Sequence, residues 1–210
     1  AEFFAEMHEE RYFECRIAEQ NMVSAAAGLA AAGKVPFVSS FGKFLARATD
    51  QIELAIVSGA NFKVCGSHSG TTLGADGPSQ MSLPDVAYFR SYGQRNVPLG
   101  RPTAKGHRKV RASDAACPVL IPADGVATWK LVELMANHDG PCYMRTLRPD
   151  TPLHYKPSET FKLGGHKVVR RGKHLMIAAN GYMLFEAIQA AEKLAAQGID
   201  ATVIDCYCLP

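Results

Sequence analysis

Short apolar runs alternate with amphipathic helical patterns along this chain, and that alternation is the feature that most constrains its fold. The runs have the length and the apolar content of buried strands. Four segments are predicted to be strands: 35–38, 62–65, 118–121 and 142–144. A shorter apolar pair, Tyr12 and Phe13, predicts a further strand before the helix that begins near Glu19.

Two helical patterns separate the later strands. Apolar residues at spacings of three and four share one face of the first pattern: Leu45, Ala48, Ile52, Ala55 and Ile56. The second pattern follows Asp124, a good N-cap, and stops before Gly140. Its apolar residues are Val126, Trp129, Leu131, Val132 and Met135. Strands that alternate with helices predict an α/β domain, with a parallel sheet flanked by helices on both faces.

The last sixty residues have a different organisation. Prolines and glycines occur among polar and basic residues in 151–171, which predicts a linker. A strand over 175–179, a helix over 184–196 and a second strand over 201–206 then form one βαβ unit with a right-handed crossover. Because one such unit is a marginal domain, we interpret 172–210 as the truncated start of a C-terminal α/β domain.

Composition excludes several classes of protein. No stretch approaches about 18 apolar residues without a charge, and residues 1–11 are acidic, so neither a membrane span nor a signal peptide is predicted. The net charge is +3, but 91–113 holds six basic residues and no acid, so the remainder totals −3. A nucleic-acid-binding surface over the whole domain is therefore not expected. We expect a cytoplasmic protein with reduced cysteines and no nucleic-acid or membrane partner.

Polar residues gather in four short blocks beside the predicted strands. In their order and spacing, these blocks resemble the pyrimidine-binding domain of transketolase. The resemblance implies a thiamine-diphosphate-binding fold, with that domain over residues 1–150, and thiamine diphosphate with Mg²⁺ as cofactors. The blocks are IAEQNM (17–22), SSFGKF (39–44), GSHSG (66–70) and DGPSQM (76–81).

Glu19 lies in the first of these blocks. An acid in a first helical turn commonly does no more than favour the helix dipole. In the family, the glutamate of this block hydrogen-bonds to the aminopyrimidine ring and favours the tautomer that removes the thiazolium proton. That role requires a carboxylic acid held in an apolar pocket. The resemblance places the role on Glu19, which is then both a catalytic and a cofactor-binding residue.

Phe41 and Phe44 are three residues apart at a predicted helix start, where aromatic residues are usually part of the core. In the family, the aromatic residues of this block line the aminopyrimidine ring of the cofactor. Stacking on a flat heteroaromatic ring contributes about 0.5–1.5 kcal/mol beyond the burial of area. The resemblance therefore implies that Phe41 and Phe44 bind the cofactor.

Five further polar residues are implied to contact the sugar. His68 follows a predicted strand, where parallel α/β sheets place their sites, and is implied to be catalytic and to bind a phosphate or hydroxyl. Asp76 reads as a turn residue, but the family uses it to accept a hydrogen bond from a substrate hydroxyl. Gln80 is implied to bind the donor ketose, and Arg148 its phosphate. The family counterpart of Arg47 lies near the substrate channel, whereas a helical arginine is otherwise usually solvated.

The chain also departs from the family. The resemblance does not extend to the domain that binds the diphosphate and Mg²⁺, so we expect no metal ligands here and expect half of the site to come from a homodimer partner or another chain. A basic insertion over 91–117 makes one connection longer than usual in the family, and we expect it to be an exposed loop.

The activity implied is transfer of a two-carbon ketol unit from a ketose phosphate to an aldose phosphate, with sugar phosphates as substrates. Two alternatives stay open. One is an enzyme similar to 1-deoxyxylulose-5-phosphate synthase, which shares the IAEQ block. The other is a non-catalytic transketolase-like subunit that acts through protein interaction. The isolated chain is expected to be inactive without the diphosphate-binding domain.

Overall fold

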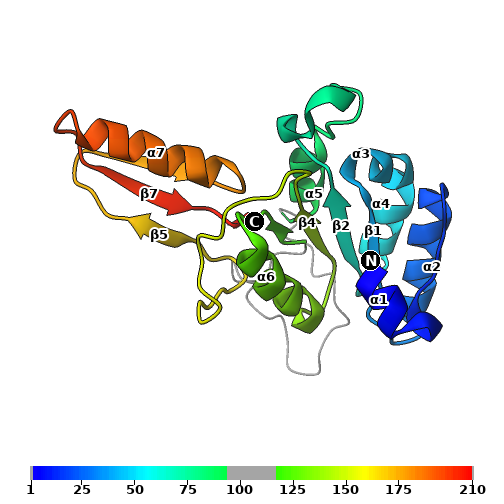
Figure 1. Ribbon diagram of the computed structural model, residues 1–210. Helices are drawn as coiled ribbons and strands as arrows, with labels where there is room; N and C mark the ends of the chain where they lie inside the picture. The colour runs from blue at the N-terminus through cyan, green and yellow to red at the C-terminus, as the bar shows by residue number, and fades with distance from the viewer. Residues whose placement is uncertain (1, 94–116, 210) are drawn as a thin grey trace.

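A mainly parallel sheet forms the centre of the first structural unit (Figure 1). The computed structural model describes residues 2–93 and 117–209. Four strands run parallel in the order β1-β2-β4-β3, and β8 adds antiparallel to β3. Their bounds are β1 (Phe37–Phe41), β2 (Lys63–Ser67), β3 (Val119–Leu120), β4 (Cys142–Arg145) and β8 (Cys208–Leu209). The four predicted parallel strands are therefore present, with bounds shifted by a few residues.

Helices cover both faces of this sheet. On one face, α2 (Glu19–Ala31), α4 (Thr49–Val57) and α5 (Asp85–Gly93) share a core with Tyr143 of β4. On the other face, α6 (Gly125–Asn137) packs Leu131 and Met135 against Cys142 and Met144. Neighbouring residues of β4 thus enter different cores, as the pleat of a strand requires. The predicted α/β fold is confirmed.

The predicted start of α6 is confirmed, and only some of its apolar residues are buried. Asp124 caps the helix, because its Oδ1 accepts a hydrogen bond from the Ala127 N–H at 2.7 Å. Leu131 and Met135 are fully buried, but Trp129 is 58% exposed and Val132 is also exposed. These two lie outside the arc that faces the sheet, since α6 buries only one stripe.

The strand predicted at Tyr12 and Phe13 is absent. The chain begins instead with α1 (Glu2–Met7) and the short 3₁₀ helix η1 (Glu9–Arg11), and residues 12–18 are irregular. Arg16 has a φ of 53°, and its N–H donates to the Glu14 carboxylate at 2.6 Å. Local side-chain bonds of this kind compete with strand pairing, and Phe13 is 66% exposed.

The C-terminal unit has the expected βαβ arrangement. Strands β6 (Leu175–Ala179) and β7 (Ala201–Asp205) pair in parallel on either side of α7 (Met183–Ala195) in the sequence. Strand β5 (Lys167–Arg170) adds antiparallel to β7 and falls inside the range expected to be a linker. Leu184 of α7 packs in the same core as β7. The C-terminal sheet therefore begins before residue 172.

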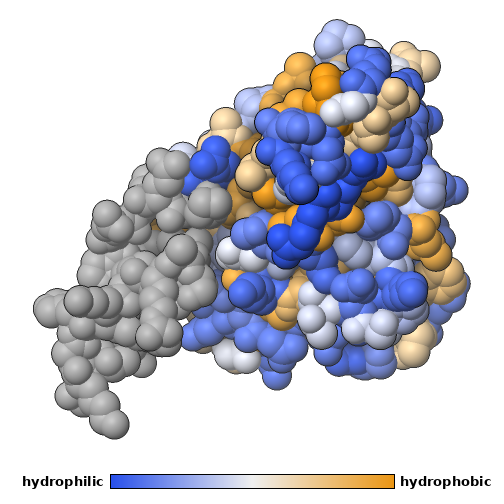
Figure 2. All heavy atoms as spheres, turned by 90° about the vertical axis from the view of Figure 1, so that its left-hand side faces the viewer, coloured by the Kyte–Doolittle hydropathy of each residue, from blue (hydrophilic) through white to orange (hydrophobic). Residues whose placement is uncertain are grey.

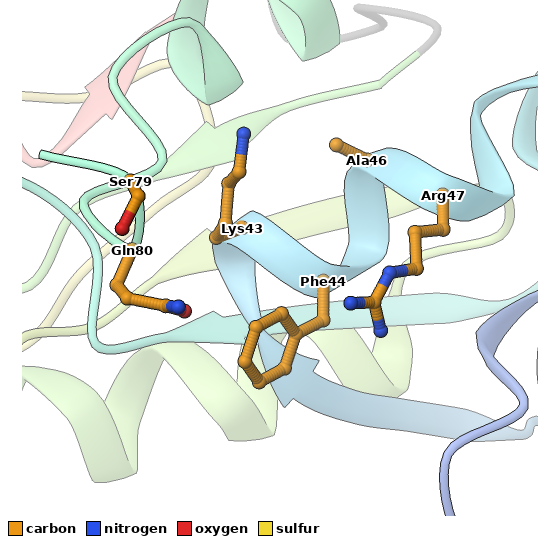
Figure 3. A pocket seen from close by; sticks show the side chains of 6 residues that line it. All are labelled: Lys43, Phe44, Ala46, Arg47, Ser79 and Gln80. Atoms are coloured by element: carbon orange, nitrogen blue, oxygen red, sulfur yellow. The ribbon is translucent and has the colours of Figure 1, made fainter.

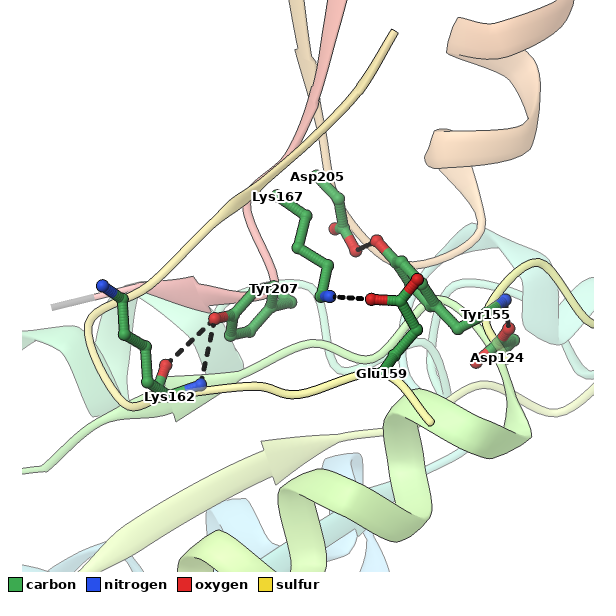
Figure 4. A network of polar contacts seen from close by, with 7 residues as sticks. All are labelled: Asp124, Tyr155, Glu159, Lys162, Lys167, Asp205 and Tyr207. Carbon is green, nitrogen blue, oxygen red and sulfur yellow. Dashed lines mark hydrogen bonds and ion pairs between the residues drawn. The ribbon is translucent and has the colours of Figure 1, made fainter. Parts of the chain in front are cut away.

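A buried polar network joins the two units (Figure 4). The backbone N–H groups of His154 and Tyr155 donate to Oδ2 of Asp124 at 2.7 and 2.8 Å. The Tyr155 hydroxyl donates to Oδ2 of Asp205 at 2.6 Å, at the end of β7. Burial raises the pKa of the Asp205 carboxyl to about 6. The segment after β4 is thus fixed to the cap of α6 and to the C-terminal sheet.

The face of the molecule seen in Figure 2 is mostly hydrophilic, with smaller hydrophobic areas between the polar side chains. Leu175 and Met176 of β6 are exposed apolar residues of the C-terminal unit. Over residues 2–93 and 117–209, no helix combines the length and apolar character needed to cross a bilayer. All six cysteines are free thiols.

Candidate functional site

The carboxyl ends of three neighbouring strands gather most of the predicted site residues. Strands β1 and β2 pair in register, with Phe41 opposite Ser67, and Gly66 of β2 lies opposite Arg145 of β4. The segments that follow these strands therefore meet at one edge of the sheet. This is where parallel α/β sheets form their binding sites.

An uninterrupted stack of flat groups lies at this edge. The rings of Phe41 and Phe44 are parallel within 2°, with 5.1 Å between centroids. The His68 imidazole lies on the Phe41 ring at 3.8 Å and 11°. At the other end, the Arg47 guanidinium carbon is 5.0 Å from the centroid of the Phe44 ring. Phe44, in α3 (Gly42–Leu45), and Arg47, in η2 (Ala46–Ala48), point to the same side of the chain (Figure 3).

Glu19 is the first residue of α2 and is buried, with 6% of its side chain exposed. Its Oε2 lies 3.5 Å from Nη1 of Arg47, which is 57% exposed. The carboxylate is thus held at the end of the stack, near the positive end of a helix dipole. Sequence reasoning placed Glu19 at a helix start, and the structure adds that Arg47 is its ion-pair partner.

His68, Asp76 and Arg148 form a polar group beside the stack. Arg148 Nη1 donates to Asp76 Oδ2 at 3.0 Å and to the Leu73 carbonyl at 3.3 Å. Asp76 ends the 3₁₀ segment η3 (Thr71–Asp76). Burial lowers the pKa of His68; the Arg148 charge lowers it further, and the Asp76 charge opposes both. These three residues, predicted separately from the sequence, are therefore electrostatically connected.

A hollow of about 360 Å³ opens beside α3 (Figure 3). Besides Phe44 and Arg47 it is lined by Lys43, Ala46, Ser79 and Gln80. The Oε1 atom of Gln80 is buried and has no hydrogen-bond partner among the described residues. Such an atom is costly unless a ligand or water satisfies it. Lys43 and Ser79 were not predicted as site residues, although both lie inside the blocks 39–44 and 76–81.

Comparison with known proteins identifies the family of this chain. Residues 1–153 match the model of the transketolase pyrimidine-binding domain, and 164–210 match that of the transketolase C-terminal domain. The chain belongs to the transketolase family. The start of the C-terminal match, at residue 164, agrees with the position of β5 ahead of the expected boundary.

Curated transketolases match along nearly the whole chain. Those of Rattus norvegicus and Homo sapiens are each 42% identical over 210 residues, which is 99% of this chain and 30% of theirs. Human transketolase-like protein 2 is 40% identical over the same share of both chains. The chain therefore spans about a third of the length of these relatives.

Solved transketolase structures have the same fold. A split gene transketolase, described as an inactive β4 tetramer, superposes with a TM-score of 0.79 at 33% identity, over 98% of this chain and 60% of that one. Transketolase from Pichia stipitis, in complex with sedoheptulose-7-phosphate, gives a TM-score of 0.69 at 20% identity, over 90% of this chain and 26% of that one.

The transketolase family implies thiamine diphosphate, and the residues at the edge of the sheet fit its aminopyrimidine ring. Phe41 and Phe44 supply an apolar aromatic surface, and Glu19 supplies a buried carboxyl that a ring nitrogen could share. The unsatisfied amide oxygen of Gln80 indicates room for a polar group in the adjoining hollow. In the part of the chain that the structure describes, no group of three His, Cys, Asp or Glu residues is placed to hold a metal ion.

Proposed function

We propose that this chain supplies the pyrimidine-binding half of a transketolase site, which transfers a two-carbon ketol unit from a ketose phosphate to an aldose phosphate. The observation that carries the proposal is the buried Glu19 carboxyl at the end of the Phe41–Phe44 stack. A buried acid needs good hydrogen-bond partners, and the contact of Glu19 with Arg47 is long, at 3.5 Å. A cofactor with a flat, nitrogen-containing ring is such a partner.

Thiamine diphosphate, when bound, supplies the nucleophilic carbon and the electron sink for breaking a bond next to a carbonyl. Glu19 would form a hydrogen bond with the pyrimidine ring. Phe41 and Phe44 would fix the plane of that ring. Arg47, whose guanidinium contacts both Phe44 and Glu19, would hold these two side chains in place at the edge of the site.

The polar residues beside the stack would bind and orient the sugar. Arg148 presents a planar fork that suits a phosphate, and Asp76 accepts hydrogen bonds from hydroxyl groups. His68, with its lowered pKa, is mostly neutral near pH 7, so its imidazole would exchange a proton with a substrate hydroxyl. Gln80 would donate or accept a hydrogen bond with the ketose from the wall of the hollow.

A second chain completes the site in this proposal, either a homodimer partner or a separate protein with the diphosphate-binding domain and its Mg²⁺. One comparison supports this arrangement. The structural neighbour at 33% identity is itself described as a split gene transketolase and as an inactive β4 tetramer.

Calorimetric titration and a ketol-transfer assay test the proposal. Thiamine diphosphate with Mg²⁺ is titrated into the chain alone and into the chain mixed with a diphosphate-binding domain from a related transketolase. We expect tight binding and transfer from xylulose 5-phosphate to ribose 5-phosphate only in the mixture. If the assembled site instead condensed pyruvate with glyceraldehyde 3-phosphate as its main reaction, the choice of donor would be wrong. If a stable mixture bound no cofactor, the chain would be a non-catalytic subunit.

A further inference from the structure

Three glycines allow close packing around the His68 loop. A Cβ on Gly66 would lie 2.4 Å from the Tyr143 hydroxyl, and one on Gly70 would lie 3.0 Å from Nη2 of Arg145. One on Gly42 would lie 2.2 Å from Oγ of Ser69. A side chain at Gly66 or Gly42 would force its neighbour to shift, and Gly70 has a φ of 90°. Side chains of β4 thus lie directly against the backbone on both sides of His68.

Tyr143 and Arg145 are in turn held by one buried carboxylate. Oδ2 of Asp85 accepts a hydrogen bond from the Tyr143 hydroxyl at 2.6 Å and from Arg145 Nε at 2.9 Å. The side chain of Asp85 is 3% exposed and that of Arg145 is 17% exposed. The Tyr143 ring also stacks on Phe89 of α5 at 3.8 Å. Asp85 is the first residue of α5, so this helix holds the guanidinium of Arg145 on β4 in place.

The loop itself has little freedom. His68 has a φ of 57°, which is unusual for a residue other than glycine. The Ser69 N–H donates to the Thr146 carbonyl at 3.2 Å, and the Gly70 N–H donates to the Met81 carbonyl at 2.6 Å. Strain of this kind persists only where the surroundings hold it. Arg145 and Tyr143 are the side chains that lie against the loop at this point.

We propose that Asp85 and Arg145 are positioning residues. They hold the backbone of the His68 loop in place, and the imidazole therefore lies parallel to the Phe41 ring. The Arg145 side chain packs against the backbone of Gly70, and Asp85 orients Arg145 and Tyr143 by hydrogen bonds. Neither residue touches the stack. The catalytic consequence rests on the proposed function, but the position of His68 does not.

Nuclear magnetic resonance of the His68 imidazole tests the proposal in this chain without any cofactor. Wild type is compared with Arg145→Lys, which keeps the charge but loses the flat fork under Gly70. Tyr143→Phe is the second variant, because it removes one donor to Asp85 and keeps the ring. His68→Gln assigns the signal, and Phe41→Leu shows the position of the signal when the aromatic face is absent.

We expect both variants to move the His68 proton signals toward their positions in Phe41→Leu. We also expect the His68 pKa to rise toward its ordinary value, because a displaced ring is better hydrated while Arg148 and Asp76 keep their charges. Glu159→Gln, which breaks an ion pair with Lys167 in the C-terminal unit, is the matched control and should change neither.

Unchanged His68 signals in folded variants would overturn the proposal. Unfolding of both variants would also overturn it, since the network would then serve the stability of the sheet rather than the position of the ring. In the assembled enzyme, Arg145→Lys should lower kcat more than it changes KM for the sugar phosphate. Shifted NMR signals without any ketol transfer in wild type would reject the proposed function and leave the positioning role intact.

Discussion

Arg148 donates a hydrogen bond to Asp76 at 3.0 Å, although the two residues are 72 positions apart in the chain. Both side chains are nearly half exposed, at 47% and 43%. An exposed pair of this kind contributes little to stability, about 0.2–1 kcal/mol. A substrate phosphate or hydroxyl group can therefore replace the Arg148–Asp76 hydrogen bond at little cost in free energy. Both residues can then bind the substrate.

Arg148→Gln should weaken recognition of phosphorylated sugars in the assembled enzyme. A charge-assisted hydrogen bond is worth about 1.5–3 kcal/mol, so we expect KM for a ketose phosphate to rise about 10- to 100-fold. KM for an unphosphorylated ketose should change little, and steady-state kinetics with both donors measures the difference. Arg170→Gln, which breaks a surface pair with Asp200 in the C-terminal unit, is the control. Equal effects on both donors would contradict a phosphate contact.

Glu19→Gln should remove most of the turnover and leave the chain folded. The amide keeps the shape of the side chain but cannot exchange a proton, and positioned acids and bases contribute about 10²- to 10⁴-fold. We expect kcat to fall within that range, with circular dichroism unchanged. Glu133→Gln, on the exposed face of α6, should retain full activity. A variant at position 19 with near-normal kcat would refute the assigned role.

Phe44→Leu should lower the affinity for thiamine diphosphate. Loss of one stacking face costs about 0.5–1.5 kcal/mol, which is a roughly two- to tenfold increase in Kd. Calorimetric titration of the assembled protein measures it. Phe185→Leu on α7 removes a half-buried ring far from the stack and provides the comparison. If the two variants bound the cofactor equally well, Phe44 would not be part of its site.

The pH dependence of stability should report on Asp205. Its carboxyl has a pKa of about 6 in the folded chain, against an ordinary value of 3.8, because burial disfavours its charge. The folded state therefore holds the proton more tightly, and stability falls as pH rises from about 4 to 6. The loss is on the order of 3 kcal/mol at pH 7 relative to pH 4.

Asp205→Asn should flatten this dependence, because an amide accepts the Tyr155 hydrogen bond without a charge. Urea unfolding at several pH values, read as wild type minus variant, isolates the contribution of one carboxyl. Parallel curves for the two proteins would mean that Asp205 titrates normally in the folded state.

Two glycines offer a matched test of packing. A Cβ on Gly172 would lie 2.3 Å from the backbone of Ala201, whereas one on Gly28, inside α2, would meet nothing within 4 Å. We expect Gly172→Ala to lower the free energy of unfolding by about 1–3 kcal/mol. Gly28→Ala should raise it by about 0.5–1 kcal/mol, because alanine favours the helix. Chemical denaturation measures both, and effects of the same sign would be inconsistent with this packing.

The sequence predicts what depends on local pattern. Asp124 was identified as a cap because its role needs only the next three residues. The strands around Val64 and Tyr143 were found because continuous apolar runs mark buried parallel strands. In contrast, β5 was missed because its two valines are flanked by basic residues, and because Val168 pairs with Ile204 of β7, more than thirty positions later.

The same limit applies to the site. The resemblance singled out Glu19 and His68, but no pattern connects Arg145 with Asp85, which is 60 positions away. Their relationship exists only once β4 lies beside α5. Likewise, Tyr12 and Phe13 resemble a strand in isolation, but the structure has local bonds to Glu14 and a positive φ at Arg16 there instead.

Strand β8 belongs to the C-terminal unit in sequence but completes the first sheet in space. Anyone who grafts a C-terminal module from one relative onto another would therefore also exchange the outermost strand of the recipient's sheet. Cutting the gene ahead of that strand would leave Val119 and Leu120 as a bare edge, open to pairing with other molecules. Chimaeras of this family should accordingly be designed so that β3 and β8 come from the same parent.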